Sequence, residues 1–183
     1  MQGFNPTLNI AAIQRKQKGL VKLFGGLAVP FYYTDVIVSE GTPMKLDLTT
    51  QDHMLPCNAG DSATLAKGLS LQVTYDDSAY GELRNYHFAN STKARLGQPT
   101  GLLTTQGYAL TNLYEGTVTY GQTAYWDAAN GALTTTVTAP VTAADKLPVI
   151  FEGTATAGPW QSSTMGTINT NQLVRIRYNF PLV

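Results

Sequence analysis

Cysteine and charge are both scarce in this chain of 183 residues. Its one cysteine, Cys57, excludes a disulfide within the chain and a structural zinc site built on clustered thiolates. Charged residues make up 13% of the sequence, against about 25% in typical soluble domains, and 12 basic side chains balance 12 acidic ones. A chain without excess positive charge lacks the electrostatic footprint of nucleic-acid recognition, so we expect no nucleic-acid partner.

Long apolar runs are missing as well. The stretch from Gly25 to Tyr33 is far shorter than the roughly 20 residues that a membrane-spanning helix requires. No basic stretch at the N-terminus is followed by an apolar run of signal-peptide length, and Gln2 stands where N-myristoylation requires glycine. We therefore expect no membrane partner and synthesis in the cytoplasm.

Motifs of known catalytic chemistry are also absent from the sequence. It has no glycine-rich phosphate loop, no paired-histidine zinc motif and no nucleophile-elbow pentapeptide. His53 and His87 have carboxylates near them in sequence, but the spacing supplies no third ligand, which favours solvent-facing or capped histidines. Asp76 and Asp77 are interpreted as a helix cap, and Cys57 as a buried or inert thiol. We expect no enzymatic activity, no metal and no cofactor.

The chain is instead rich in threonine and tyrosine, which favour strands. Alternating or short apolar patterns predict strands at 36–38, 44–48, 69–75, 102–104, 108–111, 116–120, 124–126, 133–137, 149–152 and 172–178. Residues 77–90 are the best helix candidate, which we expect to be short. The pattern predicts a mainly β protein: a β-sandwich or β-barrel of short antiparallel strands with at most one short helix.

The strongest hairpin signal is the pair Asn130 and Gly131. The pair stands between the aromatic strand 124–126 and the threonine-rich strand 133–137, and it favours a two-residue type I′ turn. Both residues are therefore expected at positive φ, where glycine and asparagine are the least strained.

Residues 1–35 differ from the rest, because four of the 12 basic residues fall within positions 15–22. We predict an extended N-terminal arm at 1–35 and a single β domain at 36–183. Such an arm cannot bury itself and is expected to bind another chain, although an edge strand and loop of the same domain is an equal alternative. The candidate partner-binding residues are Arg15, Lys16, Lys18, Lys22, Leu23 and Phe24.

Aromatic rings offer a second kind of candidate site. Flat rings stack on sugars, so Tyr120, Tyr125, Trp126 and Trp160 are candidates for a carbohydrate platform. Alternation along the strands argues for a mixture of core and surface rings, and packing in the core is the favoured interpretation for any one of them.

Four stretches with strand and turn signals follow one another between residues 66 and 137. Residues 120–135 (YGQTAYWDAANGALTT) combine a glycine, a strand with an aromatic pair, an Asn/Gly turn and a second strand rich in threonine. Residues 66–72 (AKGLSLQ), 101–107 (GLLTTQG) and 113–118 (LYEGTV) precede them. Over residues 66–137 the chain resembles the small decoration, or cement, proteins of tailed-bacteriophage heads.

The resemblance implies a non-enzymatic structural virion protein that is made in the host cytoplasm and sits on the outside of an assembled capsid. Its partners would be the major capsid protein and further copies of itself, with a homotrimer favoured, and it would clamp neighbouring capsomers. The N-terminal segment departs from shorter members of the family and is a candidate attachment device. A glycan-binding head-fibre or tail accessory module is the alternative.

Overall fold

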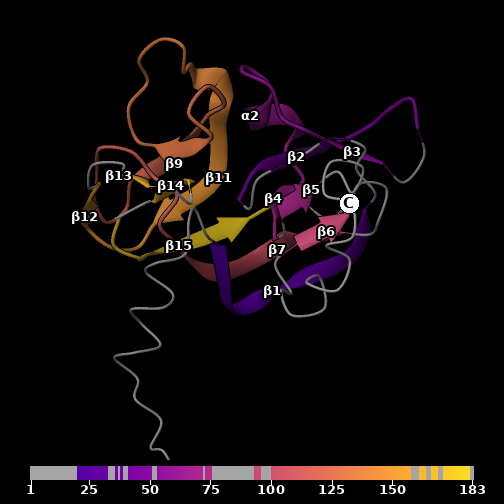
Figure 1. Ribbon diagram of the computed structural model, residues 1–183, viewed down its shortest axis with the longest axis horizontal. Helices are drawn as coiled ribbons and strands as arrows, with labels where there is room; N and C mark the ends of the chain where they lie inside the picture. Colours follow the sequence, from indigo (N-terminus) through magenta and orange to yellow (C-terminus); the bar gives the residue numbers. More distant parts are fainter. Residues whose placement is uncertain are drawn as a thin grey trace, which may run out of the picture.

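The computed structural model describes residues 20–32, 36, 38, 41–50, 53–71, 73–75, 93–95, 100–157, 161–163, 166–168 and 171–181. Most strands in these ranges belong to one nine-stranded sheet, which curls like half of a barrel (Figure 1). The prediction of a mainly β, sandwich- or barrel-like protein is confirmed. No helix within the described ranges is long and apolar enough to span a membrane.

The strands of the large sheet are β1 (Leu20–Tyr32), β2 (Pro43–Leu46), β3 (Met54–Pro56), β4 (Gly68–Ser70), β7 (Thr100–Thr111), β9 (Thr123–Asp127), β10 (Ala132–Thr134), β11 (Lys146–Phe151) and β15 (Val174–Asn179). Their order is β10-β9-β11-β15-β7-β4-β2-β3, and β1 pairs with β7 outside this path. Every pairing in this sheet is antiparallel.

Smaller elements complete the described structure. Strand β8 (Thr117–Val118) pairs with β12 (Ala155–Thr156), and β13 (Gln161–Ser163) pairs with β14 (Gly166–Ile168). Strand β5 (Val73–Tyr75) pairs in parallel with β6 (Lys93–Arg95). The helical elements are α2 (Ser62–Leu65) and the 3₁₀ turn η3 (Ala143–Asp145).

Strand β7 is the centre of the sheet. One of its edges pairs with β1, while the other pairs with β15 along residues 106–111 and with β4 at Leu102 and Leu103. Between these two segments Thr105 has a φ of 61°, and the register with β1 shifts there, which is the geometry of a β-bulge. The bulge separates the part of β7 that pairs with β4 from the part that pairs with β15.

The hydroxyl of Thr104 holds this junction together. Thr104 is fully buried, and its Oγ1 donates toward the carbonyl oxygens of Lys67 (2.9 Å) and Pro181 (3.1 Å). Lys67 directly precedes β4, and Pro181 follows β15. One buried side chain therefore links the two strands that share an edge of β7.

The long strands correct part of the sequence prediction. The strands predicted at 102–104 and 108–111 are one strand of 12 residues, because the backbone continues its pairing through Gly107. Strand β1 has 13 residues, so the strands are not uniformly short. The strand predicted at 69–75 is instead two strands, β4 and β5, which belong to different sheets.

Two further predictions differ from the structure or lie outside it. No strand forms at the described positions of 36–38: Val36 lies in a bend, and Val38 is buried outside any strand. The candidate helix at 77–90 lies outside the described residues. The short helix α2 was not predicted. The remaining predicted strands are present with bounds shifted by a few residues.

The core follows from the alternation along the strands. On β15 the side chains of Val174, Ile176 and Tyr178 are buried, while the residues between them face outward. Their inner side joins a cluster that includes Phe151 and the fully buried Tyr114, whose rings meet edge to face at 6.3 Å. Alternation thus separates an apolar inner face from a polar outer face.

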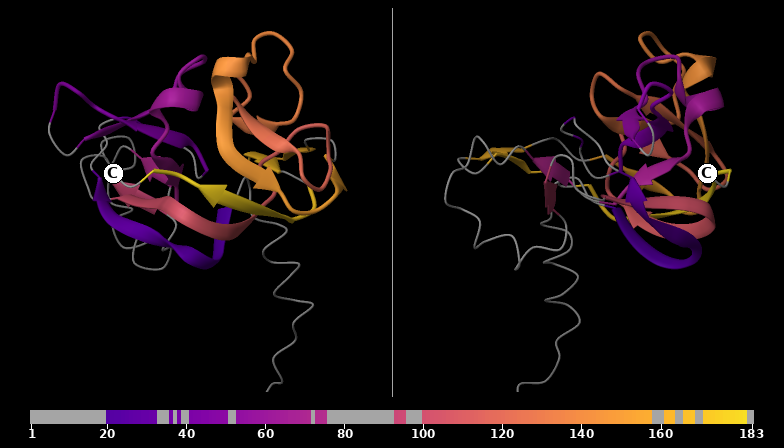
Figure 2. Two further views of the ribbon diagram at one scale, coloured as in Figure 1. Left: turned by 180° about the vertical axis from the view of Figure 1, so that it is seen from behind. Right: turned by 90° about the vertical axis from the view of Figure 1, so that its right-hand side faces the viewer.

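A buried carboxylate closes one end of the half-barrel, where α2 and η3 lie side by side (Figure 2). Asp145 is 1% exposed, and its Oδ2 accepts hydrogen bonds from the backbone N–H and the hydroxyl of Thr142, both at 2.9 Å. Its Oδ1 accepts a bond from the backbone N–H of Gly60. The carboxylate therefore joins the loop before α2 to the turn before β11.

The hairpin between β9 and β10 exists, but its turn is not the predicted type I′. The last paired residues are Asp127 and Ala132, so the loop has four residues, and only Gly131 in it has a positive φ, of 61°. The carboxylate of Asp127 accepts hydrogen bonds from the backbone N–H groups of Ala129 (2.9 Å) and Asn130 (3.1 Å). These bonds stabilise the longer loop in place of the two-residue turn.

Replacing Asp145 by asparagine tests the closure. An asparagine has the same shape, but its amide nitrogen would face N–H or O–H donors, so one buried group would lose its partner. We expect the free energy of unfolding to fall by about 1–3 kcal/mol in urea denaturation. Asp47→Asn is the matched control, since that carboxylate accepts its bonds from Thr49 at the surface. Equal losses in both variants would contradict the role of Asp145.

Replacing Gly131 by valine tests the turn. A β-branched residue is strained at positive φ, so we expect a destabilisation of roughly 1 kcal/mol or more, visible as a lower melting temperature. Ala129→Val in the same loop is the control, because Ala129 is exposed and has no positive φ. An unchanged melting temperature for the Gly131 variant would show that the loop relaxes without cost.

Candidate functional site

The outer face of the sheet across β7, β15, β11 and β9 carries several polar and charged groups. Alternation turns Arg175 and Arg177 outward on β15, with Ile176 buried between them. On β11 it turns Lys146 and Pro148 outward while Leu147 is buried. Strands from four separate parts of the sequence thus contribute to one surface.

An irregularity in the pairing of β11 with β9 creates a hollow in this surface. Lys146 pairs with Tyr125, and Ile150 pairs with Thr123, so four steps along β11 match only two along β9. Strand β11 therefore bulges away from β9 around Pro148, which has no N–H to donate to a neighbouring strand. The result is a cleft with a volume of about 390 Å³.

The cleft is lined by both polar and apolar groups. Two cations, Lys146 and Arg177, lie in its wall together with the amides of Gln106 and Asn179 and the hydroxyl of Thr123. The remaining lining residues are Leu147, Pro148, Val149, Ile150 and Tyr178. It is a site that offers several hydrogen-bond donors and two positive charges to a ligand.

A carboxylate beside the cleft orients one of these cations. Glu152 has a side chain that is 12% exposed, and its Oε1 lies 3.3 Å from Arg177 Nε. Its Oε2 lies 3.1 Å from Arg175 Nη2. Because Glu152 engages Arg177 through Nε, the two terminal nitrogens of that guanidinium are left to face other groups.

The second arginine of this group is engaged elsewhere. The guanidinium carbon of Arg175 lies 5.8 Å from the centre of the Tyr108 ring, a cation–π contact, and Arg175 does not line the cleft. In the cleft itself, the two positive charges of Lys146 and Arg177 exceed the one negative charge of Glu152 beside it. The cleft is therefore suited to an anionic group.

The candidate partner-binding residues of the N-terminal segment divide into two sets. Arg15, Lys16 and Lys18 lie outside the described residues. Lys22, Leu23 and Phe24 belong to β1, which pairs with β7. Residues 20–32 are therefore a strand at the edge of the sheet, the second of the two alternatives that the sequence left open.

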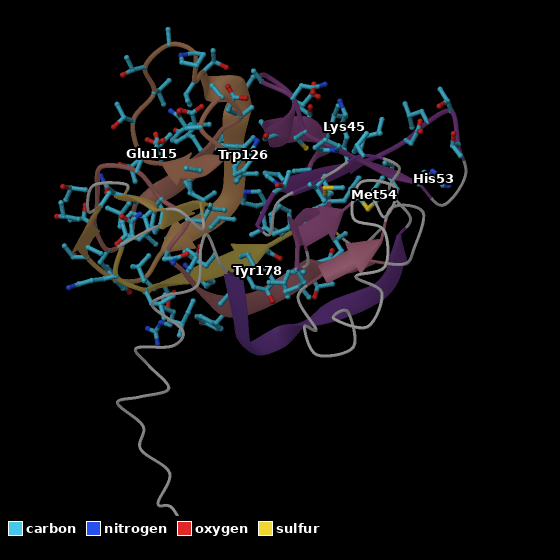
Figure 3. The ribbon with its side chains drawn as sticks, in the orientation of Figure 1. Lys45, His53, Met54, Glu115, Trp126 and Tyr178 are labelled. Atoms are coloured by element: carbon cyan, nitrogen blue, oxygen red, sulfur yellow. The ribbon has the colours of Figure 1, made fainter. Side chains whose placement is uncertain are left out.

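The candidate metal and nucleophile residues do not assemble into a site. His53 is half-buried at the start of the β3 segment, and Figure 3 shows it far from Trp126 and Tyr178. In the part of the chain that the structure describes, no three His, Cys, Asp or Glu side chains come together as metal ligands. His87, Asp76 and Asp77 lie outside it.

Cys57 is buried, as the sequence predicted. Burial raises the pKa of its thiol to about 12, because the effect of desolvation is larger than the lowering of the pKa by the positive charge of Lys45. The thiol is therefore protonated at neutral pH and is a poor nucleophile.

The candidate aromatic platform is split between two sides of the sheet. Trp126 is 4% exposed and belongs to the core, whereas Tyr120 is 72% exposed and stands in a turn. Tyr125 is half-buried on β9, next to Trp126 and so on the opposite face, while Trp160 lies outside the described residues. The core interpretation is confirmed for Trp126, and the described rings do not form one flat surface.

The cleft residues were not identified from the sequence. The alternation of Arg175, Ile176 and Arg177 does place two cations on one face of a predicted strand, and this local signal could have identified them. Lys146 and Gln106 carry no such signal, because only the pairing of β7, β15 and β11 brings them to the same surface.

Comparison with protein-family models and with curated proteins finds no match to this chain. Two features of the described surface are candidate binding sites. One is the cleft described above, and the other is a set of exposed leucines.

Proposed function

We propose that this chain is a structural virion protein that binds the outside of an assembled phage head and stabilises the contacts between capsomers. It acts as a homo-oligomer, with a trimer favoured, and its partner is the major capsid protein. The resemblance of residues 66–137 to decoration proteins supports this proposal, and so does the mainly β fold.

The observation that supports it most directly is the exposure of three leucines on or next to the neighbouring elements β2 and α2, which we call the leucine surface: Leu46, Leu48 and Leu65. Leu48 is 94% exposed in the segment 47–50, which projects from the body of the protein after β2 (Figure 1). Leu46 ends β2, and Leu65 ends α2, which packs beside β2. An apolar group on a projecting segment is suited to insertion into a partner surface.

An ion pair connects the two elements that carry Leu46 and Leu65. Lys45 on β2 donates to Asp61, which stands directly before α2, and this hydrogen bond lowers the pKa of Asp61. The two elements are thereby held in a constant relation to each other. A preformed apolar surface binds a partner with a smaller loss of conformational entropy than a mobile one.

Binding of this kind stabilises a capsid by linkage. A protein that bridges neighbouring capsomers binds the intact shell and not the separated subunits, so its binding free energy adds to the stability of the intact state. Because the chain has no net charge, apolar and hydrogen-bonded contacts dominate this binding, and salt weakens it only modestly.

The capsid role is tested with heads that lack this protein. We expect added protein to raise the temperature at which the heads release their genome, at both low and high salt. Leu48→Ser should weaken binding to heads about tenfold or more, because burying a leucine contributes about 1.5–3 kcal/mol. Binding is measured by co-sedimentation of protein with heads.

Val137→Ser is the matched control, since Val137 is an exposed apolar residue of a different loop, 50% exposed after β10. The variants should melt at the temperature of the unchanged protein. Equal release temperatures with and without the protein would contradict the capsid role and favour the glycan-binding alternative. Unchanged binding by the Leu48 variant would contradict only the leucine surface.

The basic residues of the N-terminal segment call for a separate test in the full chain. Replacing Arg15, Lys16 and Lys18 together by glutamine leaves β1 intact, because β1 begins at Leu20. We expect weaker binding to heads at low salt and a smaller effect at high salt, where exposed charges are screened. Identical binding at all salt concentrations would show that these residues do not contact the capsid.

A further inference from the structure

The cleft between β9, β11, β15 and β7 is separate from the leucine surface, and its lining shares no residue with it. We infer that this cleft binds an acidic saccharide, with a carboxylate at Lys146 and Arg177 and hydroxyl groups at the neighbouring amides. This function goes beyond capsid binding and does not depend on it.

The charge arrangement selects the carboxylate. Arg177 is held by Glu152 through Nε, so its terminal N–H groups form a fixed fork, and such a fork matches the two oxygens of a carboxylate. Lys146 lies in the same lining, and its side chain makes no ion pair with a described residue. The two cations together exceed what Glu152 neutralises, so the cleft attracts an anion.

The neutral polar groups select the rest of the ligand. Gln106 and Asn179 each offer two N–H donors and a carbonyl acceptor, and Thr123 offers a hydroxyl. Sugar hydroxyls both donate and accept, so they pair with amides more completely than an apolar group does. Pro148 and Ile150 supply apolar contact for the C–H side of a sugar ring.

The size of the cleft agrees with a small sugar. A volume of about 390 Å³ lies at the lower end of the range for small-molecule sites. The lining is held in place by strands rather than by loops: β11 pairs with β15 on one side and with β9 on the other. A site on paired strands is preformed, which favours binding of a ligand that makes only a few hydrogen bonds.

The test uses the full-length protein and D-glucuronate as the probe, with binding followed by amide chemical shifts in NMR. D-Glucose lacks the carboxylate, and triglutamate carries carboxylates without a sugar. We expect saturable shifts with glucuronate at residues 106, 123, 146, 147, 149, 150 and 177–179, and weaker binding of both comparison compounds. Lys146→Gln should weaken glucuronate binding about tenfold, in line with the loss of one charged hydrogen bond.

Arg175→Gln is the matched control. Arg175 and Arg177 stand on the same face of the same strand and share Glu152, but Arg175 does not line the cleft. Its replacement should leave glucuronate binding nearly unchanged. Asn179→Asp gives a second readout, because it adds a negative charge to the lining and should abolish binding of the acid while sparing any binding of glucose.

Three results would overturn the inference. The first is the absence of shifts with glucuronate at these residues. The second is triglutamate binding at least as tightly as glucuronate, which would indicate a site for acidic peptide segments. The third is an equal loss of affinity in the Lys146 and Arg175 variants, which would indicate a general effect of charge. None of these results bears on binding to heads, so this inference and the capsid role fail separately.

Discussion

Strand β7 pairs with three other strands, β1, β4 and β15. One edge of this strand must pair with both β4 and β15, and the β-bulge at Thr105 separates the two pairings. The buried hydroxyl of Thr104 then joins the residues next to those two strands, Lys67 and Pro181. Because β4 leads to β2 and β3 while β15 leads to β11 and β9, both halves of the curled sheet are oriented from this junction.

A second contact holds the curled sheet where α2 and η3 lie side by side. Asp145 makes this contact by accepting hydrogen bonds from both Gly60 and Thr142, and no water is needed to satisfy its carboxylate. A carboxylate with this many donors is stable when buried, whereas the same group without them would be costly. The carboxylate of Asp145 therefore fixes how the loop before α2 is placed against the turn before β11. The apolar cluster around Tyr114 and Phe151 supplies the main driving force for folding.

Departures from regular pairing produce the surface features that matter for binding. The bulge of β11 around Pro148 makes a cleft where a regular sheet would present a flat face. The described segment 47–50 after β2 projects from the body of the protein (Figure 1), and Leu48 in this segment is 94% exposed. The proposed capsid contact and the inferred saccharide site use different residues, so one protein can bind a shell and display a second binding site.

Features that depend on residues close together in the chain were predictable from the amino-acid sequence. Alternation predicted most strands and the mainly β class, the lone Cys57 was expected to be buried, and a hairpin was expected at residues 130–131; all are present. The folded structure was needed to show that β7 is one strand and that the turn is a four-residue loop held by Asp127. It alone brought Gln106, Lys146 and Arg177 together, since a cleft made by four strands depends on sheet order, and no local pattern encodes the order of strands.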